Sequence, residues 1–450
     1  MFLGNSRVVL NGLYEEYFLY AGGTFSSADN LSTENIAKWS EVRWAKLAED
    51  QTFNGDVRAI KFNFASSGTK MYVGGEFTEI NGEKFNYIAM WDGDNWNKIT
   101  ENGYTGFNGP VYALESFKGD MYFGGSFTAA CGMTSNRITR WKKSTASFDS
   151  SWMGIGTTSG LNGTVRAIAI GPPAPFDYDT IGSNNYVIYF GGSFTAANDG
   201  TIAPAMIQRY NNTWHNPRQF LGPYPQSDVI NTICIRRVGT LGEENGTVFV
   251  GGTFSGVSDL TFYSYSSSNI GIYYGGLIAE LDPVWNQAKT VSLEGLTFNG
   301  EIFSIVFRYP QTGGTTGDIF IGGNFTQVLG AGIPGNIANN IVKFSLSDGA
   351  ISVLTSNGET GTDGPVYTIA IDNSDNVYVG GGFTHAGGTS ANRIAMWDGS
   401  TWNPLKSGMN DDVYSIELDP KSKRGRGWGG GGGGYGWGGT PFGDAGPSVG

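Results

Sequence analysis

Six acidic residues in this 450-residue chain are spaced so that their carboxylates could bind a metal ion or act as acid and base. Each comes just before or within a short segment that ends in aliphatic residues, such as NGDVRAI or DGPVYTI. The six are Asp56, Asp228, Glu301, Asp363, Asp411 and Asp412. Clustered carboxylates can hold Ca²⁺, and two with different pKa values can act as acid and base in glycoside cleavage. Asp and Asn are also ordinary turn residues, so a ring of acidic turns without a bound metal is the simpler expectation.

Other residues that often carry catalysis are scarce. His215 and His385 are the only histidines, and Cys131 and Cys234 are the only cysteines. The chain contains no G-x-x-x-x-G-K-S/T, no H-E-x-x-H and no C-x-x-C motif. Phosphate loops, zinc proteases and thiol redox centres depend on such patterns. We therefore expect neither an enzyme nor a bound cofactor.

Charge and hydropathy limit the partners. The first 420 residues carry 24 basic and 39 acidic residues, a formal charge of −15. A body of that charge should repel nucleic acid and anionic membranes. No window approaches eighteen apolar residues, and the first twenty residues lack the pattern of a standard secretory signal. We expect no nucleic acid bound to the body and no insertion into a membrane.

A repeated motif indicates which elements position these residues. The pattern G-G-x-F occurs seven times, ending at Phe25, Phe77, Phe127, Phe194, Phe254, Phe325 and Phe383. Segments such as NGPVYAL precede it, and segments such as NIAKW or YIAMW follow it before a further turn. These segments are rich in β-branched and aromatic residues and are bounded by N-G, D-G or G-G turns. Each repeat therefore predicts four short strands.

Seven four-stranded units predict an all-β, seven-bladed β-propeller over residues 1–420. The chain begins with the second strand of a blade and ends with a first strand, NDDVYSI, that has no second. Pairing residues near 411–419 with residues near 16–25 would complete one blade and close the ring. Closure would remove the exposed edges on which open sheets aggregate.

The motifs G-G-x-F-T, N-R-I-A-x-W-D-G-x-x-W and N-G-x-V-Y-A-L resemble the kelch-like repeat of bacterial surface propellers, fungal cortical markers and proteins of large DNA viruses. The resemblance implies the propeller fold and a surface or virion role. The lack of a clear signal peptide or a second domain favours a virion protein assembled in host cytoplasm.

Two segments outside the regular repeat are candidates for contacts. The expected loop at 255–276 is rich in aromatic residues among serines, a mixture that suits sugar stacking or protein contact. Its aromatic residues are Phe262, Tyr263, Tyr265, Tyr273 and Tyr274. The Gly-rich segment 421–450 cannot form a core, and we expect a flexible tail that docks on a neighbouring subunit; a tail without a docking partner is the alternative. Its aromatic residues are Trp428, Tyr435, Trp437 and Phe442.

Three functions are compatible with these features. The first is a non-enzymatic surface or virion protein, whose partners are other subunits of an assembly or capsid and surface glycans. The second is a glycan-cleaving enzyme that uses the acidic mouth. The third is an intracellular scaffold, which would place the protein in the cytoplasm.

Overall fold

The computed structural model describes most of the repeat region. The described residues are 18–40, 42–65, 68–149, 160–171, 186–210, 213–216, 228–236, 247–254, 257–258, 264–265, 269–274, 296–308, 317–330, 335 and 337–419. Their regular structure consists of β-strands. No helix in these ranges is long and apolar enough to cross a membrane.

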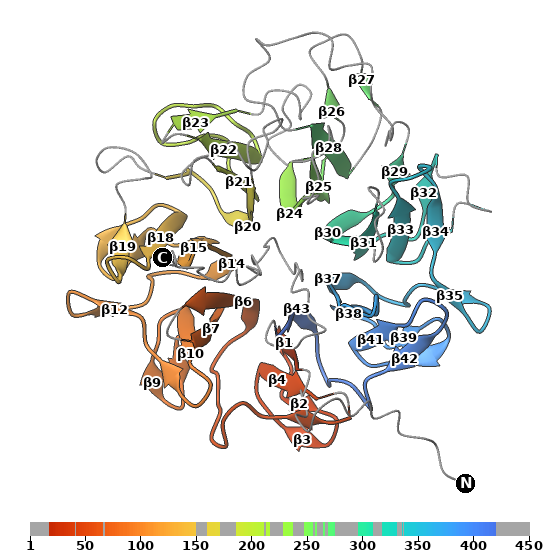
Figure 1. The fold of residues 1–450 in the computed structure, drawn as a ribbon, viewed down its shortest axis with the longest axis horizontal. Helices are drawn as coiled ribbons and strands as arrows, with labels where there is room; N and C mark the ends of the chain where they lie inside the picture. The colour runs from red at the N-terminus through yellow and green to blue at the C-terminus, as the bar shows by residue number, and fades with distance from the viewer. Residues whose placement is uncertain are drawn as a thin grey trace, which may run out of the picture.

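The sheets are arranged as a β-propeller around a central axis (Figure 1). The innermost strands are β6 (Val57–Ala65), β14 (Val111–Phe117), β20 (Val165–Gly171), β24 (Val229–Ile235), β30 (Glu301–Arg308), β37 (Val366–Ile371) and β43 (Val413–Leu418). The second strands are β7 (Gly68–Gly75), β15 (Asp120–Gly125), β21 (Val187–Gly192), β25 (Thr247–Thr253), β31 (Asp318–Asn324), β38 (Val377–Gly381) and β1 (Leu19–Gly23).

The third and fourth strands complete the sheets with antiparallel pairing. The third strands are β4 (Ile36–Trp39), β10 (Ile88–Trp91), β18 (Ile138–Lys142), β22 (Met206–Tyr210), β28 (Ile270–Tyr274), β33 (Ile341–Ser345) and β41 (Ile394–Trp397). The outer strands are β5 (Trp44–Ala45), β11 (Trp96–Asn97), β19 (Ser147–Asp149), β23 (Thr213–His215), β34 (Ile351–Val353) and β42 (Trp402–Pro404).

Short hairpins connect these strands. They are β2 (Ser27–Ala28) with β3 (Leu31–Ser32), β8 (Glu79–Ile80) with β9 (Glu83–Lys84), β12 (Thr100–Glu101) with β13 (Tyr104–Thr105), β16 (Ala129–Ala130) with β17 (Met133–Thr134), β26 (Val257–Ser258) with β27 (Ser264–Tyr265), β35 (Thr355–Ser356) with β36 (Glu359–Thr360), and β39 (His385–Ala386) with β40 (Thr389–Ser390). In addition, β29 (Thr297–Phe298) pairs with β32 (Val328–Leu329).

The prediction of seven four-stranded blades is wrong, because only six four-stranded blades are present among the described residues. Six of the described sheets have four strands, and the sheet β24-β25-β28 has three. Its third strand also lies earlier than expected, because β28 covers residues within the predicted loop at 255–276. A local interaction places β28 there. Asn269 has a φ of 69°, and its backbone amide donates to the Phe254 carbonyl, as the Asn340 amide donates to the Phe325 carbonyl in another sheet.

The two ends of the repeat region meet in one sheet. Strand β43 pairs antiparallel with β1, with Leu418 opposite Leu19 and Ile416 opposite Ala21. The same strand contacts β37 and β6. The buried cluster there combines Leu19 and Ile416, from the two ends of the repeat region, with Ala370 of the neighbouring sheet.

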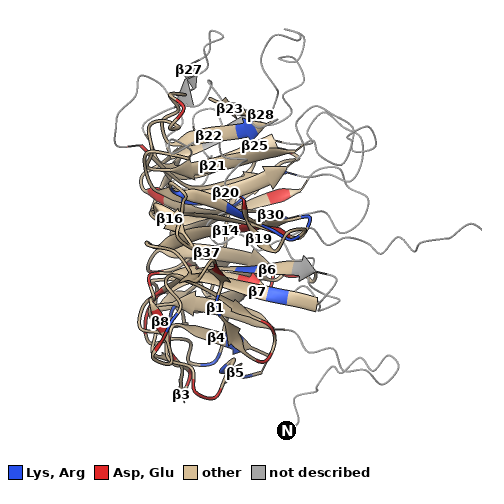
Figure 2. Cartoon of the chain, turned by 90° about the vertical axis from the view of Figure 1, so that its left-hand side faces the viewer, with Lys and Arg blue, Asp and Glu red and all other residues tan. Residues whose placement is uncertain are grey.

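The core lies between the sheets. Among the described residues, seven buried hydrophobic clusters each combine side chains from two neighbouring sheets. In the edge-on view of Figure 2, most positions along the strands are neither acidic nor basic. Because each sheet buries both faces against its neighbours, the strands are apolar on both sides.

The paired glycines at the end of each second strand permit this packing. A Cβ on Gly74 would press against the Val111 side chain of the next sheet, and one on Gly75 would collide with the Asp56 carbonyl. Neither residue has a positive φ. Close approach, rather than an unusual backbone conformation, therefore explains the G-G pair.

Candidate functional site

Every innermost strand contains a β-bulge near its start. The pairing register with the second strand shifts across one residue in all seven sheets. The bulged residues, here called the bulge ring, are Arg58, Tyr112, Arg166, Asn231, Phe303, Tyr367 and Tyr414. Bulges re-aim side chains and are common beside functional sites. The bulge ring is therefore the first candidate site.

Four members of the bulge ring stack on one another. The ring centroids of Phe303 and Tyr367 are 5.2 Å apart, and those of Tyr367 and Tyr414 are 5.3 Å apart. The Arg58 guanidinium lies 3.9 Å from the Tyr414 ring centroid. Aromatic and cation–π contacts of this kind contribute about 0.5–1.5 kcal/mol each. The stack joins four sheets.

The carboxylates beside the bulge ring also have internal partners. Arg58 binds Asp56 at 2.7 Å and Glu76 at 3.3 Å. Arg393 lies 3.6 Å from Asp412. Burial raises the pKa of Asp56 and of Asp412, and repulsion from Asp411 adds to the effect on both.

Glu301 and Asp228 lie on the other side of the wheel. Glu301 accepts a hydrogen bond of 2.9 Å from the Asn231 side chain. Partial burial raises the pKa of Asp228. The remaining acidic candidate, Asp363, lies farther from the inner strand.

The predicted acidic set thus occupies three register positions rather than one. Asp56, Glu301 and Asp412 lie two residues before the bulge, Asp228 and Asp411 three before, and Asp363 four before. Of the six, Asp411 lies near enough to Asp56 and Asp412 to raise the pKa of both carboxyls. The six carboxylates do not form a single cluster, because they belong to five different sheets.

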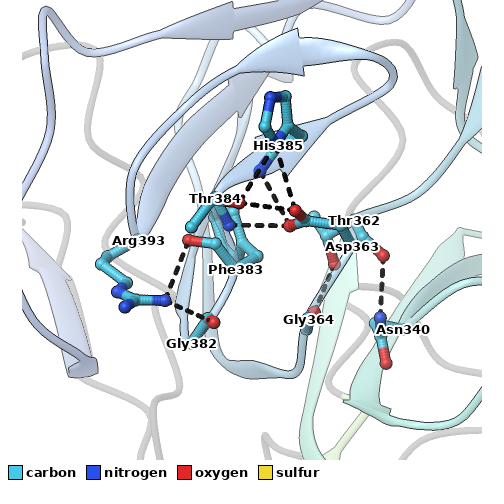
Figure 3. A network of polar contacts seen from close by, with 9 residues as sticks. All are labelled: Asn340, Thr362, Asp363, Gly364, Gly382, Phe383, Thr384, His385 and Arg393. Atoms are coloured by element: carbon cyan, nitrogen blue, oxygen red, sulfur yellow. Dashed lines mark hydrogen bonds and ion pairs between the residues drawn. The ribbon is translucent and has the colours of Figure 1, made fainter.

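Asp363 has a structural role in its turn (Figure 3). One carboxylate oxygen accepts hydrogen bonds from the amides of Thr384 and His385 at 2.7 and 2.8 Å. The other accepts from the Thr384 hydroxyl at 2.6 Å and lies 3.1 Å from His385 Nδ1. Partial burial opposes ionisation, yet these hydrogen bonds lower the pKa of Asp363 to about 2.

The same position in five other repeats is asparagine. Each of these side chains accepts hydrogen bonds from two backbone amides after G-G-x-F. They are Asn54, Asn108, Asn162, Asn299 and Asn410. Four of these asparagines belong to N-G dipeptides, which indicate a turn but do not by themselves reveal the cap. Asp363 is the acidic member of a structural series.

Asp363→Asn should leave the midpoint of thermal unfolding at pH 7 nearly unchanged, since asparagine accepts hydrogen bonds from the two equivalent amides in five other repeats. Asp363→Ala should destabilise the protein by about 1–2 kcal/mol, because the amides lose their acceptor. The lowered pKa stabilises the fold above about pH 4, and this contribution is lost as the pH falls toward 2. Scans of both variants at pH 7 and pH 3 would measure this. Equal losses of stability in the Asn and Ala variants would contradict the capping role of Asp363.

The histidines and cysteines lie apart. His215 is in β23 and His385 in β39, in different sheets. Cys131 and Cys234 are buried and not bonded to each other, and burial raises the pKa of the Cys131 thiol to about 11. Within the described ranges, no three His, Cys, Asp or Glu residues are placed to hold a metal ion.

Of the loop aromatics, Tyr265 lies in β27, and Tyr273 and Tyr274 lie in β28, where they pair with Val248 and Thr247. All three therefore lie in paired strands rather than in an unpaired loop. Two other loop residues and the four tail residues lie outside the described residues; they are Phe262, Tyr263, Trp428, Tyr435, Trp437 and Phe442.

No protein-family model matches this chain, and no curated protein matches it significantly. The structure has the propeller arrangement that the repeats predict. The specific resemblance to kelch-like surface propellers rests on the sequence motifs alone.

Proposed function

We propose that this protein is a non-enzymatic structural protein whose propeller supports recognition and assembly at the surface of a virion or cell. One observation carries the proposal: the best candidates for acid and base are held in contacts that maintain the wheel. Asp56 binds Arg58, Asp412 lies against Arg393, and Asp363 caps a turn. A general acid or base must reach its substrate.

We further propose that all seven sheets close into one ring, with β43 as the joining strand. Its pairing with β1 and its contacts with β37 and β6 support this arrangement. A buried cluster that draws on both ends of the chain supports it as well. A closed wheel would be a rigid base for loops that bind partners.

The contact elements in this proposal are the segment 255–276 and the tail 421–450. Aromatic residues of the first would bind a surface glycan or a protein. The tail would dock on another subunit, and it would lose conformational freedom on docking, which suits a reversible contact. A cytoplasmic scaffold and a glycan-cleaving enzyme are the competing functions.

Replacing Tyr263 and Tyr265 together by Ser should weaken binding to glycans or partner proteins by about tenfold, from the loss of roughly 1.4 kcal/mol of contact. Incorporation into assemblies should be unchanged. Deleting 421–450 should have the opposite pattern. Glycan arrays, partner capture and sedimentation of assemblies would measure both.

Tyr104→Ser is the matched control, because this tyrosine is 60% exposed on the separate β12–β13 hairpin. It should change neither readout. Incubation with oligosaccharides should release no cleaved product. Reproducible hydrolysis that Asp56→Asn or Glu301→Gln abolishes would refute the non-enzymatic proposal and establish the glycosidase.

A further inference from the structure

Three charged side chains are buried together in the inner wall of the wheel. Lys61 lies on β6, Glu115 on β14 and Glu417 on β43, and β6 contacts both other strands. Their relative exposures are 2%, 0% and 6%. The Lys61 ammonium lies 3.9 Å from Glu115 and 3.7 Å from Glu417. We call these residues the Lys61 triad.

The fold does not require charge at these positions. Each triad residue lies three residues after the bulge of its strand, and the equivalent residues of the other four sheets are small or apolar. They are Ala169, Cys234, Val306 and Ala370, all buried. Buried ion pairs are often no more stabilising than apolar residues of similar size. The charges are therefore a local feature of three adjacent sheets.

The triad contains two carboxylates for one ammonium. Besides Lys61, the Phe62 amide donates a hydrogen bond to Glu417. Tyr20 stands opposite Glu417 in the pairing of β1 with β43. Tyr72 and Tyr122 stand opposite Lys61 and Glu115 in the same way. Burial raises the pKa of all three tyrosines, so they are uncharged near neutral pH.

Among the described residues, the cations on neighbouring elements make contacts outside the triad. Lys38, opposite Tyr20 on β4, lies 5.0 Å from the Phe18 ring centroid. On β20 and β37 the equivalent residues are Ala169 and Ala370. Arg140 lies over the Tyr122 ring, but it is engaged with Asp149 and Asp120. Asp419, near Tyr20, adds negative charge. With both carboxylates ionised, the buried triad therefore has a net negative charge that burial disfavours.

We propose that the Lys61 triad takes up one proton between mildly basic and mildly acidic solution, and that this proton strengthens the attachment of β43 to the wheel. Protonation of either carboxylate leaves one ammonium facing one carboxylate, which is a neutral pair. The device would make the joining strand of the propeller sensitive to pH, whatever ligand the loops bind.

The direction of the effect follows from the pKa of Glu417. Burial raises this pKa to about 7, although Lys61 acts to lower it. A carboxyl whose pKa is higher in the folded state stabilises that state most below its unfolded pKa, near 4.5. This stabilisation is lost as the pH rises through about 7. Strand β43 should therefore be held more firmly at pH 5.5 than at pH 8.

Hydrogen exchange of the full-length protein, read by mass spectrometry over residues 413–418, tests the proposal. After correction for intrinsic exchange rates, wild-type opening should increase on the order of tenfold from pH 5.5 to pH 8. Both Glu417→Gln and Glu115→Gln should reduce this ratio to within about twofold, because each leaves a neutral pair. Glu83→Gln, at a surface ion pair 68% exposed, is the control and should keep the wild-type ratio.

An equal wild-type opening rate at the two pH values would overturn the proposal without any variant. Retention of the wild-type ratio by either triad variant would overturn it too, since the proton would then bind elsewhere. The midpoint of thermal unfolding, measured at the same two pH values, provides an independent readout and should fall with pH only in the wild type and the control.

Discussion

Lys61→Met is expected to reduce the free energy of unfolding at pH 7 by about 3–5 kcal/mol, the usual cost of removing one partner from a buried ion pair. Methionine fills much of the same space, so the loss comes chiefly from two carboxylates left without their cation. Glu115 and Glu417 are both almost completely buried. Urea unfolding at pH 7, followed by tryptophan fluorescence, would measure the change.

Two comparisons distinguish this electrostatic loss from a packing defect. The loss should be smaller at pH 5, where the carboxylates can take up protons. The triple variant Lys61→Met, Glu115→Gln, Glu417→Gln should recover part of the stability, because it removes the uncompensated charge. A loss below about 1 kcal/mol, or one that is the same at both pH values, would show that the triad charges are not coupled as the distances indicate.

Ending the chain at residue 410 should cause aggregation or misfolding. The truncation removes β43, which leaves the edge of β1 unpaired and takes Val413, Ile416 and Leu418 out of a buried cluster. Unpaired edges and exposed cores both promote association between chains. Soluble yield and light scattering after purification would measure the effect.

Ending the chain at residue 420 is the matched control. This deletion keeps β43 and removes only the Gly-rich tail, so soluble yield and unfolding midpoint should remain close to those of the full chain. Equal solubility of the two truncations would contradict the proposed role of β43 as the joining strand. The same result would also count against the proposal that protonation of the Lys61 triad stabilises the propeller through β43.

Local patterns predicted much of the architecture. The G-G-x-F motif indicated where each second strand ends, because its glycines meet fixed neighbours such as Val111 and the Asp56 carbonyl. The unmatched first strand at 410–416 indicated the pairing with the N-terminal sheet. These features depend on residues close together in the chain or on the order of repeats. The sequence itself therefore determined the propeller class and most strand pairings, but not the third strand of the β24-β25-β28 sheet.

The sites depended on tertiary structure. A bulge reverses the alternation of side chains along a strand, so the side on which Tyr414 or Glu417 lies cannot be counted from the strand's first residue. The predicted acidic set accordingly separated into three positions. Lys61 and Glu115 come from successive repeats and Glu417 from the far end of the repeat region, and nothing local marks the three as partners. Only the stacking of three sheets buries their charges together and makes those charges sensitive to protonation.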